Sequence, residues 1–201
     1  MRKVPLSRRE VLRGVGAVGV LGALGTPTGV FADETTVRWD IISVDFAAGT
    51  VSAGGVASAL ANDGSKITLT GSGTFPPDEE GDVTGGGTWK TFSRTGGQTG
   101  SGTYRVTGFV SWERAPGTPP LPIDKIGNLA DNSAGLAVLR VRYSDGSRGV
   151  LTVSCHLVET PGSVFEGITT TKGFVDYWNR VAPPSPPGNE NRTTFHITPE
   201  V

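Results

Sequence analysis

The sequence predicts an all-β protein built as a single antiparallel β-barrel of about eight strands, with a β-sandwich as the alternative architecture. The chain holds 30 glycines and 14 prolines among 201 residues. Such a content of turn-forming residues favours many short strands over helices. The second observation is a long hairpin at 135–158, in which two alternating apolar runs flank an Asp-Gly turn.

The register of this hairpin follows from its side chains. A two-residue loop at Asp145-Gly146 would mix polar and apolar residues on both faces. A three-residue loop at 144–146, with Gly146 in the left-handed region, gives one uniformly apolar face. That face carries Ala137, Leu139, Val141, Tyr143, Leu151, Val153, Cys155 and Leu157. The other face carries Arg140, Arg142, Arg148, Thr152, Ser154 and His156. We therefore predict the three-residue loop.

The remaining strands are predicted from runs of β-branched and aromatic residues between turn signals. They lie at 36–46, 55–61, 66–75, 85–92, 100–113, 163–171 and 193–197. A second Asp-Gly turn joins 55–61 to 66–75 and would place Ala57 and Ala59 opposite Leu69 and Ile67. The word Gly-Ser-Gly-Thr-aromatic, which begins at Gly71 and again at Gly100, predicts a bend in a strand.

Two segments lack a strand pattern. The segment 115–133 is rich in proline and is too long to be an ordinary connection, which is typical of a lid or binding loop. It either covers a barrel mouth through apolar side chains such as Leu121 and Leu129, or runs over the surface with one helical turn at 124–130. The proline-rich segment 183–189 is predicted to be an extended linker.

Residues 1–32 read as an export signal, in which a basic segment precedes an apolar run of small residues. Arg8 and Arg9 follow Ser7, and the run is only moderately hydrophobic, so the segment resembles the bacterial twin-arginine signal. Cleavage is expected after Ala32, leaving one domain at 33–201. The resemblance implies a secreted or cell-surface protein of bacterial type, exported folded by the twin-arginine translocase. An uncleaved membrane anchor is the alternative, disfavoured by the glycines of this run.

The charge of the domain excludes some partners. Removing five basic residues and one acidic residue with the signal leaves 13 basic and 18 acidic residues. No Lys/Arg cluster with interleaved aromatics is left, so we expect neither nucleic-acid binding nor stable membrane insertion after cleavage. The single cysteine, Cys155, excludes an internal disulfide and is expected to be a buried core residue rather than a reactive thiol.

No catalytic motif is present, so candidate chemistry rests on single residues. His156, Arg140 and Glu166 are the candidate acids or bases, and Arg142, Tyr177 and Trp178 are candidate ligand-binding residues. Cys155 and His156 are neighbours on a strand and point to opposite faces, so they cannot act as a nucleophile and base pair. The acidic segment 76–82 lacks the ligand spacing of a calcium loop. We predict no metal and no cofactor.

The strand number, the glycine-containing bends and the lid-like loop together resemble calycin-type barrels, including allene oxide cyclase-like and dirigent-like proteins. This resemblance implies a barrel that binds, or cyclises, a small apolar molecule. The leading hypothesis is therefore a barrel that binds a small or hydrophobic ligand in its interior. Whether the protein is an enzyme stays open: the alternatives are an isomerase or cyclase using the lumen, and a cell-surface module in which Trp89, Trp112 or Trp178 stacks on carbohydrate or contacts a protein.

Overall fold

A computed structural model describes residues 35–77, 82–184 and 189–199. The predicted export signal, with Arg8, Arg9 and the cleavage position after Ala32, lies outside the described residues. The linker prediction at 183–189 is described only at its two ends. Within the described ranges, no helix is long and apolar enough to cross a lipid bilayer.

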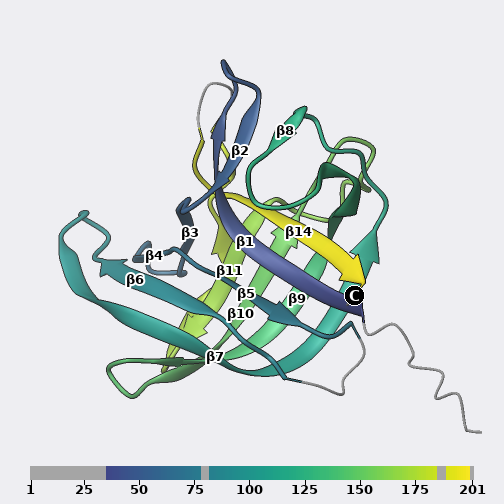
Figure 1. Cartoon of the computed structure of the whole chain (residues 1–201). Coiled ribbons are helices and arrows are strands. Elements are labelled where there is room, and N and C mark those ends of the chain that lie inside the picture. The colour runs from purple at the N-terminus through teal and green to yellow at the C-terminus, as the bar shows by residue number, and fades with distance from the viewer. Residues whose placement is uncertain (1–34, 78–81, 185–188, 200–201) are drawn as a thin grey trace, which may run out of the picture. The chain divides into compact units, whose positions relative to one another are not determined.

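Six antiparallel strands close into a barrel, which confirms the predicted fold class. In order around the ring they are β1 (Thr35–Asp45), β5 (Ser72–Phe75), β6 (Gly86–Phe92), β7 (Gln98–Ala115), β9 (Asn132–Tyr143) and β14 (Arg192–Pro199). β14 pairs with β1 and completes the ring (Figure 1).

Further strands extend the ring on both sides. From β9 the sheet continues through β10 (Arg148–Cys155), β11 (Gly167–Lys172) and β12 (Val175–Tyr177). From β6 it continues through β4 (Lys66–Leu69), β3 (Ala57–Leu60) and β13 (Asn179–Arg180). The two extensions approach each other where β3 meets β11 (Figure 1). β2 (Thr50–Ala53) folds back on β1 and pairs in parallel with the short β8 (Ile123–Asp124).

The central hairpin has the predicted register. Leu139 lies opposite Leu151 and Ala137 lies opposite Val153. Tyr143 N–H donates to Ser147 O at 2.9 Å and Gly146 has φ of 89°, so the loop has three residues and its glycine is left-handed. The second hairpin also matches its prediction, because Ala57 pairs with Leu69 and Ala59 pairs with Ile67.

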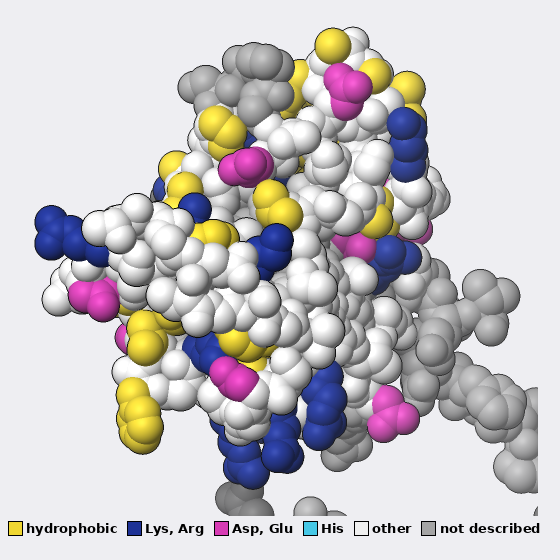
Figure 2. Space-filling view, turned by 90° about the vertical axis from the view of Figure 1, so that its left-hand side faces the viewer, with side chains coloured by type: hydrophobic (Ala, Val, Ile, Leu, Met, Phe, Trp, Pro, Cys, Tyr) yellow, Lys and Arg dark blue, Asp and Glu magenta, His cyan; other side chains and the backbone are white. Residues whose placement is uncertain are grey.

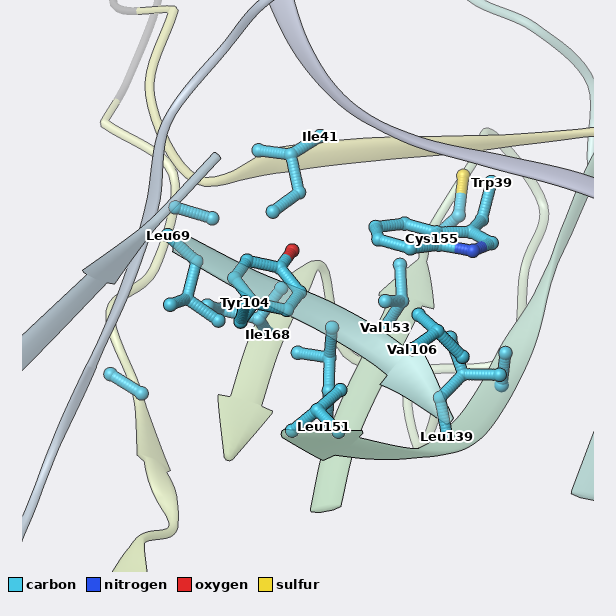
Figure 3. Packing of buried hydrophobic residues seen from close by; sticks show 14 of the residues in the cluster. Trp39, Ile41, Leu69, Tyr104, Val106, Leu139, Leu151, Val153, Cys155 and Ile168 are labelled. Atoms are coloured by element: carbon cyan, nitrogen blue, oxygen red, sulfur yellow. The ribbon is translucent and has the colours of Figure 1, made fainter. Parts of the chain in front are cut away.

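The apolar face of the hairpin forms the centre of a single core. All eight of its predicted residues are buried, and they join side chains from β1, β3, β4, β7 and β11 in one cluster (Figure 3). The close-up shows Trp39 and Ile41 of β1 above Tyr104, Leu139 and Val153. Six side chains from the apolar faces of the two hairpins are 2 % exposed or less. These residues are Ala57, Leu69, Leu139, Val141, Leu151 and Val153.

Two predicted strands differ in extent. The run 66–75 divides at Gly71 into β4, which pairs with β3 and β6, and β5, which pairs with β1. A Cβ atom at Gly71 would lie 2.7 Å from Gly86 O, so this close crossing of strands requires glycine. The strand expected at 163–171 begins only at Gly167, because the preceding residues form a turn in which Val164 N–H donates to Pro161 O at 2.9 Å.

Candidate functional site

The segment 116–131 covers the outside of the barrel rather than its mouth. It crosses the face of β1 that carries Ile42 and Val44, opposite to the face that carries the core residues Trp39 and Ile41. Two backbone pairings hold it, the Thr118–Val158 bridge and the pairing of β8 with β2, and a 3-10 turn at Leu129–Asp131 leads from it into β9. In Figure 1 this lid is the loop around β8, beside β14.

Asp124 fastens the lid to the barrel wall. Its Oδ1 accepts the backbone N–H groups of Ile126 at 2.8 Å and Gly127 at 3.3 Å. Its Oδ2 lies 2.9 Å from Nε2 of His196, a buried residue of β14. Burial acts to raise the pKa of Asp124, but these N–H groups and His196 outweigh burial and lower it. Gly127 packs directly on the imidazole, where a Cβ atom would lie 2.8 Å from Cδ2.

A cavity of about 60 Å³ lies between the lid and the wall. Most of its lining is apolar, with side chains from the lid on one side and from β1 and β2 on the other. The apolar lining consists of Ile42, Val44, Phe46, Val51, Pro119, Pro120, Leu121, Leu129 and Leu157. The polar lining consists of Asp124, Asn132, His156, Glu166, Arg192, Thr193 and Thr194. Apolar walls with a few converging polar groups are typical of small-molecule sites.

Glu166 is a second carboxylate of the cavity lining, beside Asp124. Its Oε2 accepts the backbone N–H of His156 at 2.5 Å, and its Oε1 accepts that of Thr193 at 2.6 Å. The side chain therefore joins the end of β10 to the start of β14, where no strand pairing connects them. Burial raises the pKa of Glu166 to about 8, although both N–H groups and the charge of Arg192 favour the ionised form.

Two polar atoms of the lining are buried without a hydrogen-bond partner among the described residues. They are Oδ1 of Asn132 and Nε of Arg192. The Nδ2 group of Asn132 donates to Thr194 Oγ1 at 2.7 Å, which fixes the amide. The guanidinium of Arg192 stacks on Phe46, with its carbon 4.8 Å from the ring centre. Among the lining residues, one acceptor and one donor are thus unpaired within the described part of the chain.

The structure brings two of the three candidate acids or bases together. His156 and Glu166 both line the cavity, whereas Arg140 lies on the outer face of β9. Arg142 is also on that outer face and is exposed. The polar face of the central hairpin therefore lies on the side away from the core, where its arginines and His156 are exposed and Ser154 is buried. His156 is exposed and Cys155 is fully buried, which confirms their predicted separation.

The aromatic candidates separate by burial. Tyr177 is 4 % exposed and belongs to the core cluster, so its ring does not offer a binding surface. Trp89 is buried and Trp112 packs against the core. Trp178 is 60 % exposed, which leaves it as the indole available for stacking among the four tryptophans.

Asp124, Asn132 and His196 are cavity or anchor residues that the sequence reading did not assign to a site. A local signal existed for Asp124, since aspartate side chains often accept hydrogen bonds from the backbone two residues later and so form Asx turns. Asp124 accepts from the N–H groups of Ile126 and Gly127 in this way. Nothing local indicates that this turn meets His196, because 72 residues separate the pair.

No family model, curated protein or solved structure matches the chain. The resemblance to calycin-type barrels therefore stays a prediction. Within the described residues, no group of three or more His, Cys, Asp or Glu side chains is arranged to hold a metal ion.

Proposed function

We propose that the protein binds a small, largely apolar molecule with one polar end, in the cavity between the 116–131 lid and the outer face of β1. The observation that carries the proposal is this cavity's lining: beside its apolar side chains it includes Asn132 and Arg192, whose buried Oδ1 and Nε atoms have no partner among the described residues. A ligand hydroxyl donates one hydrogen bond and accepts others, so its chemistry matches this pair of atoms.

The size of the cavity limits the ligand. A cavity of about 60 Å³ is well below the 300–1,000 Å³ or so of pockets that enclose a drug-sized molecule. The bound group is therefore a short alkyl segment, or the apolar end of a longer molecule that extends past the lid. The packed core favours this location over the lumen, because Leu139, Leu151 and Val153 of the central hairpin are fully buried against one another's strands.

An enzyme using His156 and Glu166 is the second candidate function, since both side chains line one cavity. Both oxygens of Glu166 are already occupied by backbone N–H groups. These contacts indicate that Glu166 connects β10 to β14, and they leave neither oxygen free for proton transfer to a substrate. Nδ1 of His156 lies 2.7 Å from Val164 O, which occupies one ring nitrogen as well. Binding without turnover is the function favoured by these contacts.

The test is a titration of the folded domain with butan-1-ol, hexan-1-ol and octan-1-ol, followed by amide chemical shifts. Each methylene buried should tighten binding by about 0.8 kcal/mol, or roughly fourfold, until the cavity is full. Shifts should concentrate at Val51, Leu121 and Leu129. Val51→Trp fills the cavity and should abolish the response.

Val110→Trp is the matched control, because Val110 is 37 % exposed on β7 and does not line this cavity. It adds the same bulk and should leave binding unchanged. Equal responses in the two variants, or shifts centred on Leu139 and Leu151 in the barrel interior, would overturn the proposed location. Chemical conversion of an added alcohol or carbonyl analogue, lost in His156→Ala, would favour the enzyme instead.

A further inference from the structure

A row of arginines crosses the outer face of the sheet. It lies near the end of β9 at Tyr143, whereas the lid joins β9 at its other end, at Asn132. Arg105 of β7 lies directly opposite Arg142 of β9, which lies directly opposite Arg148 of β10. Arg140 is two residues from Arg142 on β9 and therefore projects from the same face. We call these four residues the arginine row.

Each side chain of the arginine row is exposed, and none forms a salt bridge with a described carboxylate. Arg140 makes one hydrogen bond, from Nη1 to Phe109 O at 3.2 Å. Like charges directly opposite each other on a sheet repel and destabilise it. An anion bound across the row offsets that repulsion, and this makes the free energy of binding more favourable.

The surface around the row is a shallow groove of about 560 Å³. Besides the arginines it is lined by Thr107, Val141, Gly149 and Val150. Beyond Arg105 the next strand presents Gly86, which has no side chain to block an extended ligand. Figure 2 shows basic side chains gathered along the lower edge of one side of the molecule.

The chemistry of the lining selects among polyanions. Arginine binds carboxylate, sulfate and phosphate groups through two parallel hydrogen bonds. Neighbouring strands are about 4.8 Å apart, so the three aligned arginines span about 10 Å. Single-stranded nucleic acids are normally bound by stacking bases on aromatic side chains, and the groove lining has none. A charged polymer without bases fits this surface better.

We propose that the arginine row is a binding site for an acidic polysaccharide, whose carboxylate or sulfate groups lie across β7, β9 and β10. The site is independent of the cavity under the lid. It joins Arg140 and Arg142, which the sequence analysis assigned to separate roles, in one surface with Arg105 and Arg148.

The experiment measures binding of the folded domain to polygalacturonate and to dextran sulfate over a range of salt concentrations. The double variant Arg142→Gln/Arg148→Gln should weaken binding at least tenfold. It should also reduce the slope of log affinity against log salt concentration by about two, because two fewer counterion-releasing contacts remain. Its thermal midpoint should stay equal or rise, since the variant removes repulsion.

The control variant Arg94→Gln/Lys125→Gln makes the same change in net charge at two exposed positions outside the groove. It should leave both affinity and salt slope within twofold of the parent chain. An equal loss in both double variants would show attraction by net charge alone and would overturn the site. Binding of oligo-dT as tightly as the polysaccharides would overturn the ligand class, and so would full competition by millimolar sulfate. The two polymers together distinguish a preference for sulfate from one for carboxylate.

Discussion

The protonation of the Glu166 side chain is expected to make the free energy of unfolding depend on pH. Its pKa rises from an ordinary 4.5 to about 8 through burial. Between these values the folded chain holds a proton that the unfolded chain has released, so raising the pH favours unfolding. Glu166 therefore stabilises the fold fully below about pH 4.5, and this contribution is lost as the pH rises towards 8. The slope approaches about 1.4 kcal/mol per pH unit in the middle of the window.

Urea unfolding of the parent chain and of Glu166→Gln between pH 5 and 9 measures this effect. The glutamine keeps an acceptor oxygen and does not titrate, so the variant should lose the pH-dependent part that Glu166 contributes. The difference in free energy of unfolding between the two proteins should change steeply up to about pH 8 and flatten above it. A difference that is constant across the range would mean that Glu166 is ionised throughout.

The role of a residue could be predicted from the sequence where it depends on nearby residues, and not where it depends on distant ones. Cys155 was predictable as a core residue because alternation along one strand determines its face. Glu166 was visible as a candidate acid, but its partners are backbone N–H groups of His156 and Thr193 from two other segments. Contacts of that kind depend on the closed fold, and a single sequence does not reveal them.

In each of the two Asp-Gly hairpins, a glycine with a left-handed backbone conformation shapes the turn and so sets the strand register. Gly146 has φ of 89°, and a Cβ atom there would meet nothing within 4 Å, so only conformation opposes a side chain. Gly146→Ala should cost about 1–2 kcal/mol, the penalty of a left-handed residue that carries a Cβ atom. Gly162 also has open space, but its φ is outside the left-handed region. Gly162→Ala should change stability by less than half as much.

Chemical denaturation of both alanine variants measures the comparison. If Gly162→Ala lost as much stability as Gly146→Ala, the cost would come from the side chain itself and not from the turn. Unchanged stability in Gly146→Ala would mean that the loop can adopt another conformation, and with it another register.

Elements whose partners are close in sequence were predicted well, and those closed by distant contacts were not. Both hairpins have their expected registers because turn chemistry and alternation act over a few residues. The lid was recognised as a long irregular segment, yet its place over the outer wall depends on Asp124 meeting His196. β2 is an exception, because it was missed although it forms a local hairpin with β1 across the turn at 46–49.

At the scale of the whole molecule, composition and strand spacing were sufficient to predict a barrel. The ring of six strands closes through β1, which pairs with β5 on one side and with β14 at the other end of the chain. Pairings of such sequence separation leave no local pattern, so the number of strands in the ring could not be derived. The single continuous core stabilises the barrel without an internal disulfide, since the chain has one cysteine.

That continuous core makes the only cysteine a reporter of global unfolding. Cys155 is fully buried, and burial raises the pKa of its thiol well above its ordinary range, so the reactive thiolate is absent from the folded barrel. We expect a thiol reagent such as DTNB to label the native chain only through global opening. The labelling rate should increase with added urea as the unfolding equilibrium does.

Leu139→Ala tests whether opening is global, because Leu139 lies in the same core on a different strand. Truncating a buried leucine costs about 2–5 kcal/mol. The labelling rate of Cys155 should therefore rise by roughly 30-fold or more, although this side chain does not pair with the cysteine in the register. Val110→Ala, at an exposed position of β7, should leave the rate nearly unchanged. Fast labelling that is independent of both urea and Leu139→Ala would instead reveal local opening at the end of β10, beside Glu166 and the lid cavity.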